Sequence, residues 1–230
     1  MAVLEVKDLL KGFVSPDGER TVIVDVPRFT VDETEQTALQ GSSGSGKTTF
    51  LNLIAGILQP DSGDISIAGQ PLTRLSEAGR DRLRAQSIGY VFQTFNLLQG
   101  YTALENVLLG MMFGRGSDPE YARVLLERVG LKDRMNYRPR QLSVGQQQRV
   151  AVARALANHP KLVLADEPTG NLDFHHAREA LRLIREVCQE QGAALLLVTH
   201  DRDILTQFEH VRHLADINRA AAPMPGPAGP

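Results

Sequence analysis

The stretch Gly41-Ser-Ser-Gly-Ser-Gly-Lys-Thr48 decides the fold. It matches the pattern G-x-x-x-x-G-K-[ST], follows a short strand expected at 37–40 and opens a helix expected at 48–58. Glycines let backbone N–H groups turn inward around phosphate groups, and a helix N-terminus adds partial positive charge. We therefore expect a phosphate loop in which Lys47 reaches the β- and γ-phosphates and Thr48 ligates Mg²⁺. The alternative, a serine- and glycine-rich turn with an accidental Lys-Thr pair, is disfavoured by the flanking strand and helix.

A second motif, Leu162-Val-Leu-Ala-Asp166-Glu167, ends an apolar strand with two carboxylates. We expect Asp166 opposite the phosphate loop, where it holds Mg²⁺ through water. Glu167 is placed to polarise the attacking water as the general base. Two acidic residues that only solvate a strand end are the alternative, which the phosphate loop disfavours. Together the two motifs predict a nucleoside triphosphatase.

The order of segments predicts a mixed α/β fold. Continuous apolar runs at 162–165 and 195–198, with a long helix at about 174–191 between them, are typical of central strands in a buried parallel sheet. The middle of the chain, at about 74–157, is expected to be mostly helical, because cap signals occur at Thr102, Asp118 and Ser143. Further strands are expected at 2–7, 21–26, 28–31 and 65–67.

Composition limits the class of protein. The chain has 230 residues, and 25 Lys and Arg against 27 Asp and Glu give a formal charge of −2, which argues against bulk electrostatic binding of nucleic acid. The single cysteine, Cys188, cannot form an internal disulfide and is expected to be a small helix residue.

Apolar runs fall short of the roughly 20 residues that a membrane span needs, and no signal peptide is apparent, so we expect a soluble chain. The tail at 220–230 holds four prolines and two glycines and is expected to be disordered.

Several further motifs lie between and after the first two, in a fixed order. One family has a signature that corresponds here to Leu142-Ser-Val-Gly-Gln146 and a Q-loop glutamine that corresponds to Gln93. Its D-loop corresponds to Asn171-Leu-Asp173, and its switch histidine stands in Thr199-His200-Asp201. With them, the sequence resembles the nucleotide-binding subunit of an ATP-binding-cassette (ABC) transporter over about residues 2–217.

The resemblance implies an ATPase that forms a head-to-tail homodimer with two ATP molecules at its interface. His200 then contacts the γ-phosphate, Gln93 senses Mg²⁺ or water, and Asp173 lies at the dimer interface. Phe13 is expected to stack on the adenine. Each ATP would be held by the loop residues of one subunit, Gly41, Ser42, Ser43, Gly44, Ser45, Gly46, Lys47, Thr48 and Thr49, and by Ser143, Gly145 and Gln146 of the other.

One position departs from the family pattern. The usual signature is Leu-Ser-Gly-Gly-Gln, and Val144 replaces its first glycine. The backbone there must tolerate a β-branched residue, which disfavours positive φ. We expect function to persist because Ser143 and Gly145 remain. His175 and His176 are expected to be exposed residues at a helix start.

The resemblance also implies the architecture and the partners. The expected fold is a P-loop NTPase core of ABC-ATPase type with an N-terminal antiparallel β subdomain and an inserted α-helical subdomain at about 84–157. One ATP-binding domain would cover 1–219. The expected partner is a separate integral membrane permease subunit on the cytoplasmic face of a membrane, and no nucleic acid is expected.

The sequence Thr169-Gly-Asn171 indicates a branch of the family. It is similar to the group that contains the lipoprotein-release ATPase LolD, the macrolide exporter MacB and the division ATPase FtsE. An exporter or mechanotransmission system is therefore expected. The subunit of an ABC importer is one alternative. A soluble ABC-type ATPase of DNA maintenance is another, although the chain has no room for the coiled coils or zinc modules of such proteins.

Overall fold

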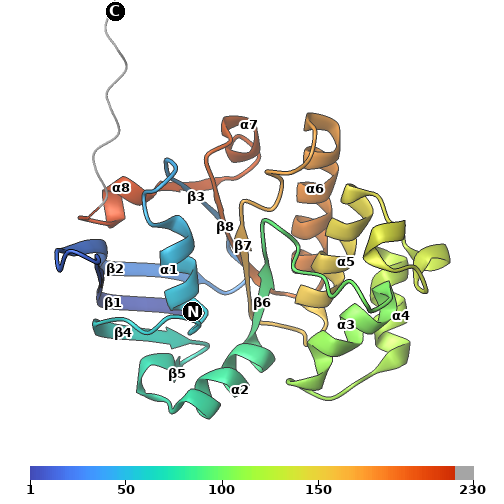
Figure 1. Cartoon of the computed structure of the whole chain (residues 1–230), viewed down its shortest axis with the longest axis horizontal. Helices are drawn as coiled ribbons and strands as arrows, with labels where there is room; N and C mark the ends of the chain where they lie inside the picture. The colour runs from blue at the N-terminus through green and yellow to red at the C-terminus, as the bar shows by residue number, and fades with distance from the viewer. Residues whose placement is uncertain (221–230) are drawn as a thin grey trace, which may run out of the picture.

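The computed structural model describes residues 1–220 and contains two sheets with helices around them (Figure 1). The antiparallel sheet has the strand order β2-β1-β4-β5 and the parallel sheet the order β6-β7-β8-β3-β9. The strands are β1 (Ala2–Val14), β2 (Arg20–Asp32), β3 (Gln36–Gln40), β4 (Ser62–Ile67), β5 (Gln70–Pro71), β6 (Ile88–Val91), β7 (Leu162–Asp166), β8 (Ala194–Thr199) and β9 (His210–His213). The predicted mixed α/β fold is confirmed.

The helices lie between these strands in the chain. They are α1 (Lys47–Ile54), α2 (Glu77–Ser87), α3 (Ala103–Met112), α4 (Pro119–Arg128), α5 (Val144–Leu156), α6 (Phe174–Glu190), α7 (Arg202–Leu205) and α8 (Leu214–Ile217). Short 3₁₀ helices occupy Leu72–Arg74, Lys132–Arg134 and Pro139–Gln141. Apart from Ala220, the tail predicted to be disordered lies outside the described residues. Within residues 1–220, no helix is long and apolar enough to cross a membrane.

The parallel sheet is buried on both faces. Along β7, Val163 and Ala165 belong to the core shared with α3, α4, α5 and α6, whereas Leu162 and Leu164 belong to the core shared with α1 and the antiparallel sheet. Strand β8 shows the same alternation, because successive side chains of a strand point to opposite faces. Figure 1 shows the resulting layers, with α1 and the antiparallel sheet on one side of the parallel strands and α3–α6 on the other.

The register of the parallel strands brings four loops to one edge of the sheet. Gln40 at the end of β3 pairs with Thr199 at the end of β8, and Asp166 at the end of β7 pairs with Val198. Strand β6 pairs with β7 on the far side. The segments that follow these strands therefore begin next to one another.

The N-terminal strands are longer than the predicted segments at 2–7, 21–26 and 28–31. Strand β2 continues through Pro27, which was expected to interrupt it. Because β2 is the edge strand of its sheet, the missing N–H of a proline can be accommodated there. On the neighbouring strand β1, Asp8 adopts a φ of 48° and has no partner in the register of β1 with β2. The irregularity at Pro27 therefore involves both strands.

Helix α1 and strand β9 also differ from the predictions. Helix α1 ends at Ile54 rather than at 58, because Gly56 turns the chain with a φ of 65° and the N–H groups of Ile57 and Leu58 both donate to Asn52. Strand β9 was not predicted, since it is short and exposed and pairs only with β3. The predicted N-caps Thr102, Asp118 and Ser143 are confirmed, and each accepts a hydrogen bond from a backbone N–H of its helix.

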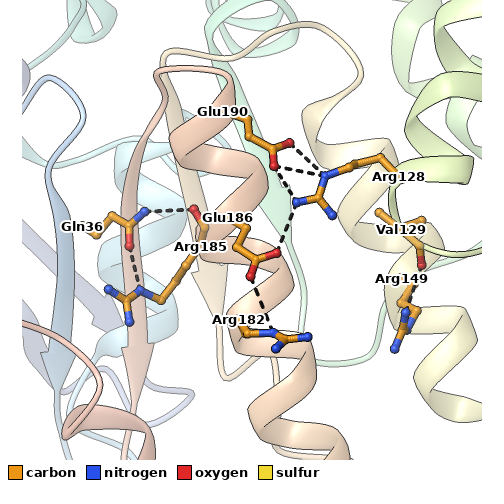
Figure 2. A network of polar contacts seen from close by, with 8 residues as sticks. All are labelled: Gln36, Arg128, Val129, Arg149, Arg182, Arg185, Glu186 and Glu190. Atoms are coloured by element: carbon orange, nitrogen blue, oxygen red, sulfur yellow. Dashed lines mark hydrogen bonds and ion pairs between the residues drawn. The ribbon is translucent and has the colours of Figure 1, made fainter.

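Arginine side chains connect the helices on one side of the sheet (Figure 2). Arg128 at the end of α4 donates to Glu190 at 2.9 Å and to Glu186 at 3.2 Å, both on α6. These two carboxylates hold the pKa of Arg128 above its ordinary value. Arg149 on α5 donates to the carbonyl oxygen of Val129 at 3.1 Å. The three helices are thus joined at their solvent-facing sides as well as through the core.

The contact between β6 and α5 leaves no room for a side chain at Gly89, where a Cβ atom would lie 2.3 Å from the carbonyl oxygen of Ala155. We expect Gly89→Ala to lower the free energy of unfolding by about 1–3 kcal/mol, because the strand and helix must move apart. Urea denaturation measures the change. Gly100→Ala is the matched control, since nothing lies within 4 Å of that position. Equal stability of the two variants would contradict this packing argument.

Candidate active site

The loop between β3 and α1 has the backbone that the glycines of the phosphate loop allow. Gly44 and Gly46 have φ angles of 78° and 93°, which favour glycine. A Cβ at Gly41 would lie 2.6 Å from the hydroxyl oxygen of Ser45, so the loop is also closely folded on itself. Gly46 is the N-cap of α1 and has no capping side chain. The first N–H groups of α1 therefore have no partner within the helix and remain available to an anion.

An open pocket of about 440 Å³ lies at this helix start. It brings together nine of the predicted residues from four separate segments and adds Ile23 of β2, which was not predicted. Gly41, Ser42 and Ser45 belong to the loop but do not line the pocket. The lining residues are Ile23, Ser43, Gly44, Gly46, Lys47, Thr48, Thr49, Gln93, Glu167 and His200.

Lys47 is almost fully buried at the floor of this pocket. Its ammonium group donates to the carbonyl oxygens of Gly41 at 2.8 Å and Ser42 at 2.9 Å. The same nitrogen lies 3.4 Å from Oε1 of Glu167. The lysine is thus held between its own loop and the carboxylate that follows β7.

Three side chains fix the carboxylate of Glu167. The hydroxyl of Thr199 donates to Oε2 at 3.0 Å, and Nδ1 of His200 lies 2.7 Å from Oε1, the oxygen that Lys47 also approaches. The φ of Glu167 is 44°, a left-handed value that costs free energy in a non-glycine residue. Its N–H donates to the carbonyl oxygen of Val198, which holds the backbone in this conformation.

Thr199 belongs to the motif Thr199-His200-Asp201, and the sequence alone does not predict a role for it. Its hydroxyl accepts from the N–H of Asp201 at 3.1 Å while donating to Glu167, so one buried side chain orients both the carboxylate and the segment with His200. The bond between His200 and Glu167 places a proton on Nδ1. Nε2 can then donate to a phosphate oxygen only when the ring carries a second proton.

Asp166 is the second buried carboxylate. Burial raises the pKa of Asp166 above its ordinary value, and the charge of Glu167 raises it further, whereas Thr48 and Lys47 act in the opposite direction. Its buried Oδ1 atom has no hydrogen-bond partner. Burial, with a smaller contribution from Asp166, also raises the pKa of Tyr90.

These residues fit a Mg²⁺ ion. The unpartnered oxygen of Asp166, the Thr48 hydroxyl and the Gln93 amide offer the oxygen ligands that Mg²⁺ prefers, and the ion commonly binds with one or two carboxylates, phosphates and waters. Within residues 1–220, no group of three or more His, Cys, Asp or Glu side chains gathers to hold a metal by itself.

The loop with Gln93 is attached to the segment after Glu167. The carbonyl oxygen of Gln93 accepts from Nδ2 of Asn171 at 2.7 Å. A Cβ at Gly170 would lie 3.3 Å from the Gln93 amide nitrogen, so these two segments are in close contact. The predicted Q-loop and D-loop residues therefore meet at the rim of the pocket.

The other predicted residues lie outside the pocket. Ser143 caps α5 and forms a reciprocal capping box with Gln146, with bonds of 3.2 Å and 3.0 Å. Val144 is the first residue of α5 and has a negative φ, which explains why a β-branched side chain is tolerated. A Cβ at Gly145 would meet only Cδ2 of His176, at 3.7 Å. Within residues 1–220, no contact therefore requires a glycine at this position.

Phe13 and Asp173 are also outside the pocket. Phe13 is 45% exposed and pairs with Thr21, two residues from Ile23, which lines the pocket. Asp173 is the N-cap of α6 and accepts from the N–H of His176 at 3.1 Å. The exposure predicted for His176 is confirmed, since its side chain is 57% exposed.

Comparisons with known proteins agree with this arrangement. A model of the ABC transporter family matches residues 24–170. The ATP-binding cassette MJ0796, in a dimeric post-hydrolysis state bound to ADP and Pi, is 34% identical, with 91% of this chain and 93% of that chain covered and a TM-score of 0.83. A second dimeric structure, described as MJ0796, a bacterial ABC transporter cassette, is 35% identical with the same coverage and TM-score.

CbiO1 from Clostridium perfringens, part of the ABC transporter complex cbiONQ, is 30% identical, with 92% of this chain and 84% of that chain covered and a TM-score of 0.78. The family match spans more than half of the chain, and the structural matches span about nine tenths of it. The chain belongs to the ABC transporter family and is one of its ATP-binding, ATP-hydrolysing domains.

Proposed function

We propose that the chain is the ATPase subunit of an ABC transporter complex, forms a homodimer with two ATP molecules at its interface, and drives a separate membrane subunit. The pocket carries this proposal, because it joins Lys47, Glu167 and His200 while the signature residues lie outside it. One ATP-binding domain covers 1–219, with a helical subdomain at about 84–157. The subunit is peripheral on the cytoplasmic face of the membrane and binds no nucleic acid.

The roles of the site residues follow from their chemistry. The loop N–H groups and Lys47 bind the phosphates, and Thr48, Gln93 and, through water, Asp166 hold Mg²⁺. The ion, when bound, neutralises phosphate charge. When the nucleotide binds, Lys47 exchanges its carbonyl partners for phosphate oxygens. Its ammonium group, which lies 3.4 Å from Oε1 of Glu167, then no longer neighbours that oxygen.

Glu167 then acts as the general base. Thr199 bonds to its Oε2 and His200 to its Oε1, and these bonds keep the carboxylate oriented. Once Lys47 has turned to the phosphates, Oε1 keeps a lone pair that accepts a proton from water. The water oxygen forms a bond to the γ-phosphorus, the bond to the ADP oxygen breaks, and phosphate leaves. His200 is assigned to the γ-phosphate through its Nε2 atom, since Nδ1 is bonded to Glu167.

The nucleotide base is assigned to the paired strands β1 and β2 at the edge of the pocket. Phe13 offers an exposed ring for stacking on adenine. Asp61 supports this position, because its carboxylate accepts from Lys11 at 2.9 Å, from the N–H of Gly12 at 2.8 Å and from Arg20 at 2.9 Å. These bonds lower the pKa of Asp61 to about 2.

The proposal of a dimer is supported by the predicted ATP-binding residues that lie outside the pocket. Ser143, Gly145 and Gln146 lie at the exposed start of α5, where a helix N-terminus suits a γ-phosphate. The open space at Gly145 suits the close approach of a group from a second chain. Asp173 is assigned to the same interface. The two MJ0796 structures are themselves described as dimeric.

A groove of about 540 Å³ is assigned to a short helical segment of the membrane subunit. Its wall is largely apolar, with Ile57, Phe92, Leu109 and Phe113 among the lining residues, and Phe113 is 77% exposed. Such a groove accepts the apolar face of an amphipathic helix.

The sequence around Thr169 favours an exporter or mechanotransmission system of LolD or MacB type over an importer. Purification of the tagged chain from detergent-solubilised native membranes distinguishes them. An integral membrane subunit with a large extracytoplasmic domain is the expected partner. Recovery of a permease that depends on a binding protein would instead assign the chain to an importer.

Glu167→Gln should abolish ATP hydrolysis, because the amide cannot accept the proton, while ATP binding and dimerisation persist. The hydrolysis rate, measured by phosphate release, should fall by at least about 100-fold, the lower range for a general base. Size-exclusion chromatography with ATP should show a stable dimer. Retained full turnover would remove Glu167 as the base.

Gly145→Asp should prevent the ATP-dependent dimer, because a carboxylate at this position repels a phosphate. The fold should be unchanged, since only His176 lies near the position. Val144→Gly is the neighbouring control and should keep or raise activity, because Val144 is exposed and its φ is ordinary for a helix. Dimer formation by Gly145→Asp, or a large loss with Val144→Gly, would contradict the assignment of the signature.

Phe113→Asp should abolish copurification with the membrane subunit, because it replaces the exposed aromatic ring that the apolar face of the helix would pack against with a charge. Val124→Asp on α4 is the matched control, since Val124 is 59% exposed and outside the groove. Thermal denaturation should give similar midpoints for both variants. Equal recovery of the membrane subunit with both would refute the groove as its docking site.

A further inference from the structure

The loop after β6 contains two consecutive residues with left-handed backbone. Phe95 has a φ of 58° and Asn96 a φ of 49°. Asparagine tolerates this region, whereas phenylalanine does not, and each such residue costs on the order of 1–3 kcal/mol. A conformation of this kind persists only where surrounding groups fix it.

Arg154 of α5 supplies those groups. Its Nη2 donates to the carbonyl oxygen of Phe95 and its Nη1 to that of Asn96, both at 2.6 Å. The planar guanidinium suits two adjacent acceptors. Within the described part of the chain no carboxylate pairs with Arg154, and burial lowers the pKa of its guanidinium. The charge of this partly buried arginine is therefore held by two loop carbonyls.

The surrounding structure is shaped to admit this side chain. A Cβ at Gly110 of α3 would lie 2.9 Å from Cγ of Arg154 and 3.1 Å from its carbonyl oxygen. Only a glycine leaves the arginine its path to the loop. The contact thus involves three elements, α3, α5 and the loop after β6.

Phe95 and Asn96 follow Gln93 in the chain with only Thr94 in between, and the side chain of Gln93 lines the nucleotide pocket. On its other side Gln93 is held by Asn171, which donates to its carbonyl oxygen at 2.7 Å. The position of the Gln93 amide therefore depends on two attachments. Asn171 provides the first and the Arg154 fork provides the second.

We propose that Arg154 is a positioning residue for ATP hydrolysis, which acts by holding the strained turn that places Gln93 in the nucleotide pocket. The proposal rests on the role of Gln93 proposed above. Arg154 does not line the pocket itself, so it affects turnover through Gln93 rather than through contact with the nucleotide.

The test is a double-mutant cycle in the full chain, with Arg154→Gln and Gln93→Ala alone and combined. Arg154→Gln should lower kcat about tenfold, equivalent to 1.36 kcal/mol, and change KM for Mg·ATP by less than about twofold. In the Gln93→Ala background, Arg154→Gln should cause no further loss, because residues that act as a unit are not additive. Arg154→Lys should be intermediate, since a lysine keeps the charge without the fork.

Arg149→Gln is the matched control. Arg149 lies on the same helix and donates to the carbonyl oxygen of Val129 at 3.1 Å (Figure 2). It also pairs with Glu179 at 3.5 Å, and neither partner belongs to the Gln93 loop. Its loss should lower the thermal midpoint but leave kcat near that of the wild type. Circular dichroism melting of every variant separates instability from a change in turnover.

Three outcomes would overturn the proposal. Additive losses in the cycle would mean that Arg154 does not act through Gln93. An equal loss of kcat in Arg149→Gln would mean that any damage to α5 has the same effect. An unchanged kcat in Gln93→Ala would remove the role of Gln93 and this proposal with it, while the assignment of Glu167 would stand. If Arg154→Gln does not fold, Arg154→Lys completes the cycle.

Discussion

The site depends on the hydrogen-bond register of the parallel strands. Gln40 pairs with Thr199, Asp166 with Val198 and Val91 with Ala165, so the loops that follow β3, β8, β7 and β6 begin at one edge of the sheet. A slip of one residue would turn every side chain of a strand to the opposite face. Since both faces of β7 and β8 are buried, the alternation of apolar side chains into two cores fixes this register. The packing of the sheet thus determines the geometry of the site.

Much of this arrangement could be predicted from the sequence, because its signals are local. The phosphate loop, the caps at Thr102 and Ser143 and the buried strands are each determined by residues a few positions apart. The fork of Arg154 on Phe95, by contrast, joins segments that are far apart in the sequence, and neither segment carries a signal for it. The left-handed backbone of Glu167 was equally unpredictable, because a hydrogen bond to β8 holds it in place.

The two buried carboxylates of the site differ in how many of their oxygen atoms have a hydrogen-bond or ion-pair partner. Glu167 has contacts with Lys47, Thr199 and His200, so its orientation does not depend on a ligand. Asp166 has a buried oxygen without a partner, and its pKa is raised. Because a buried polar atom without a partner costs free energy, a cation that approaches Asp166 gains more than one that approaches Glu167. We infer that this difference separates the metal-binding role from the role of the base, although the two residues are adjacent.

Helix α5 connects the parts of the molecule that the proposed function requires to act together. Its start carries Ser143, which in the proposed dimer meets the nucleotide of the other subunit. In its middle, buried Gln148 donates to the carbonyl oxygen of Pro168, the residue after Glu167. Near its end, Arg154 holds the loop of Gln93 and lines the groove assigned to the membrane subunit. In the proposed dimer, a displacement of this helix would therefore be transmitted to Pro168, next to the proposed base, and to Phe95 and Asn96 in the loop of Gln93.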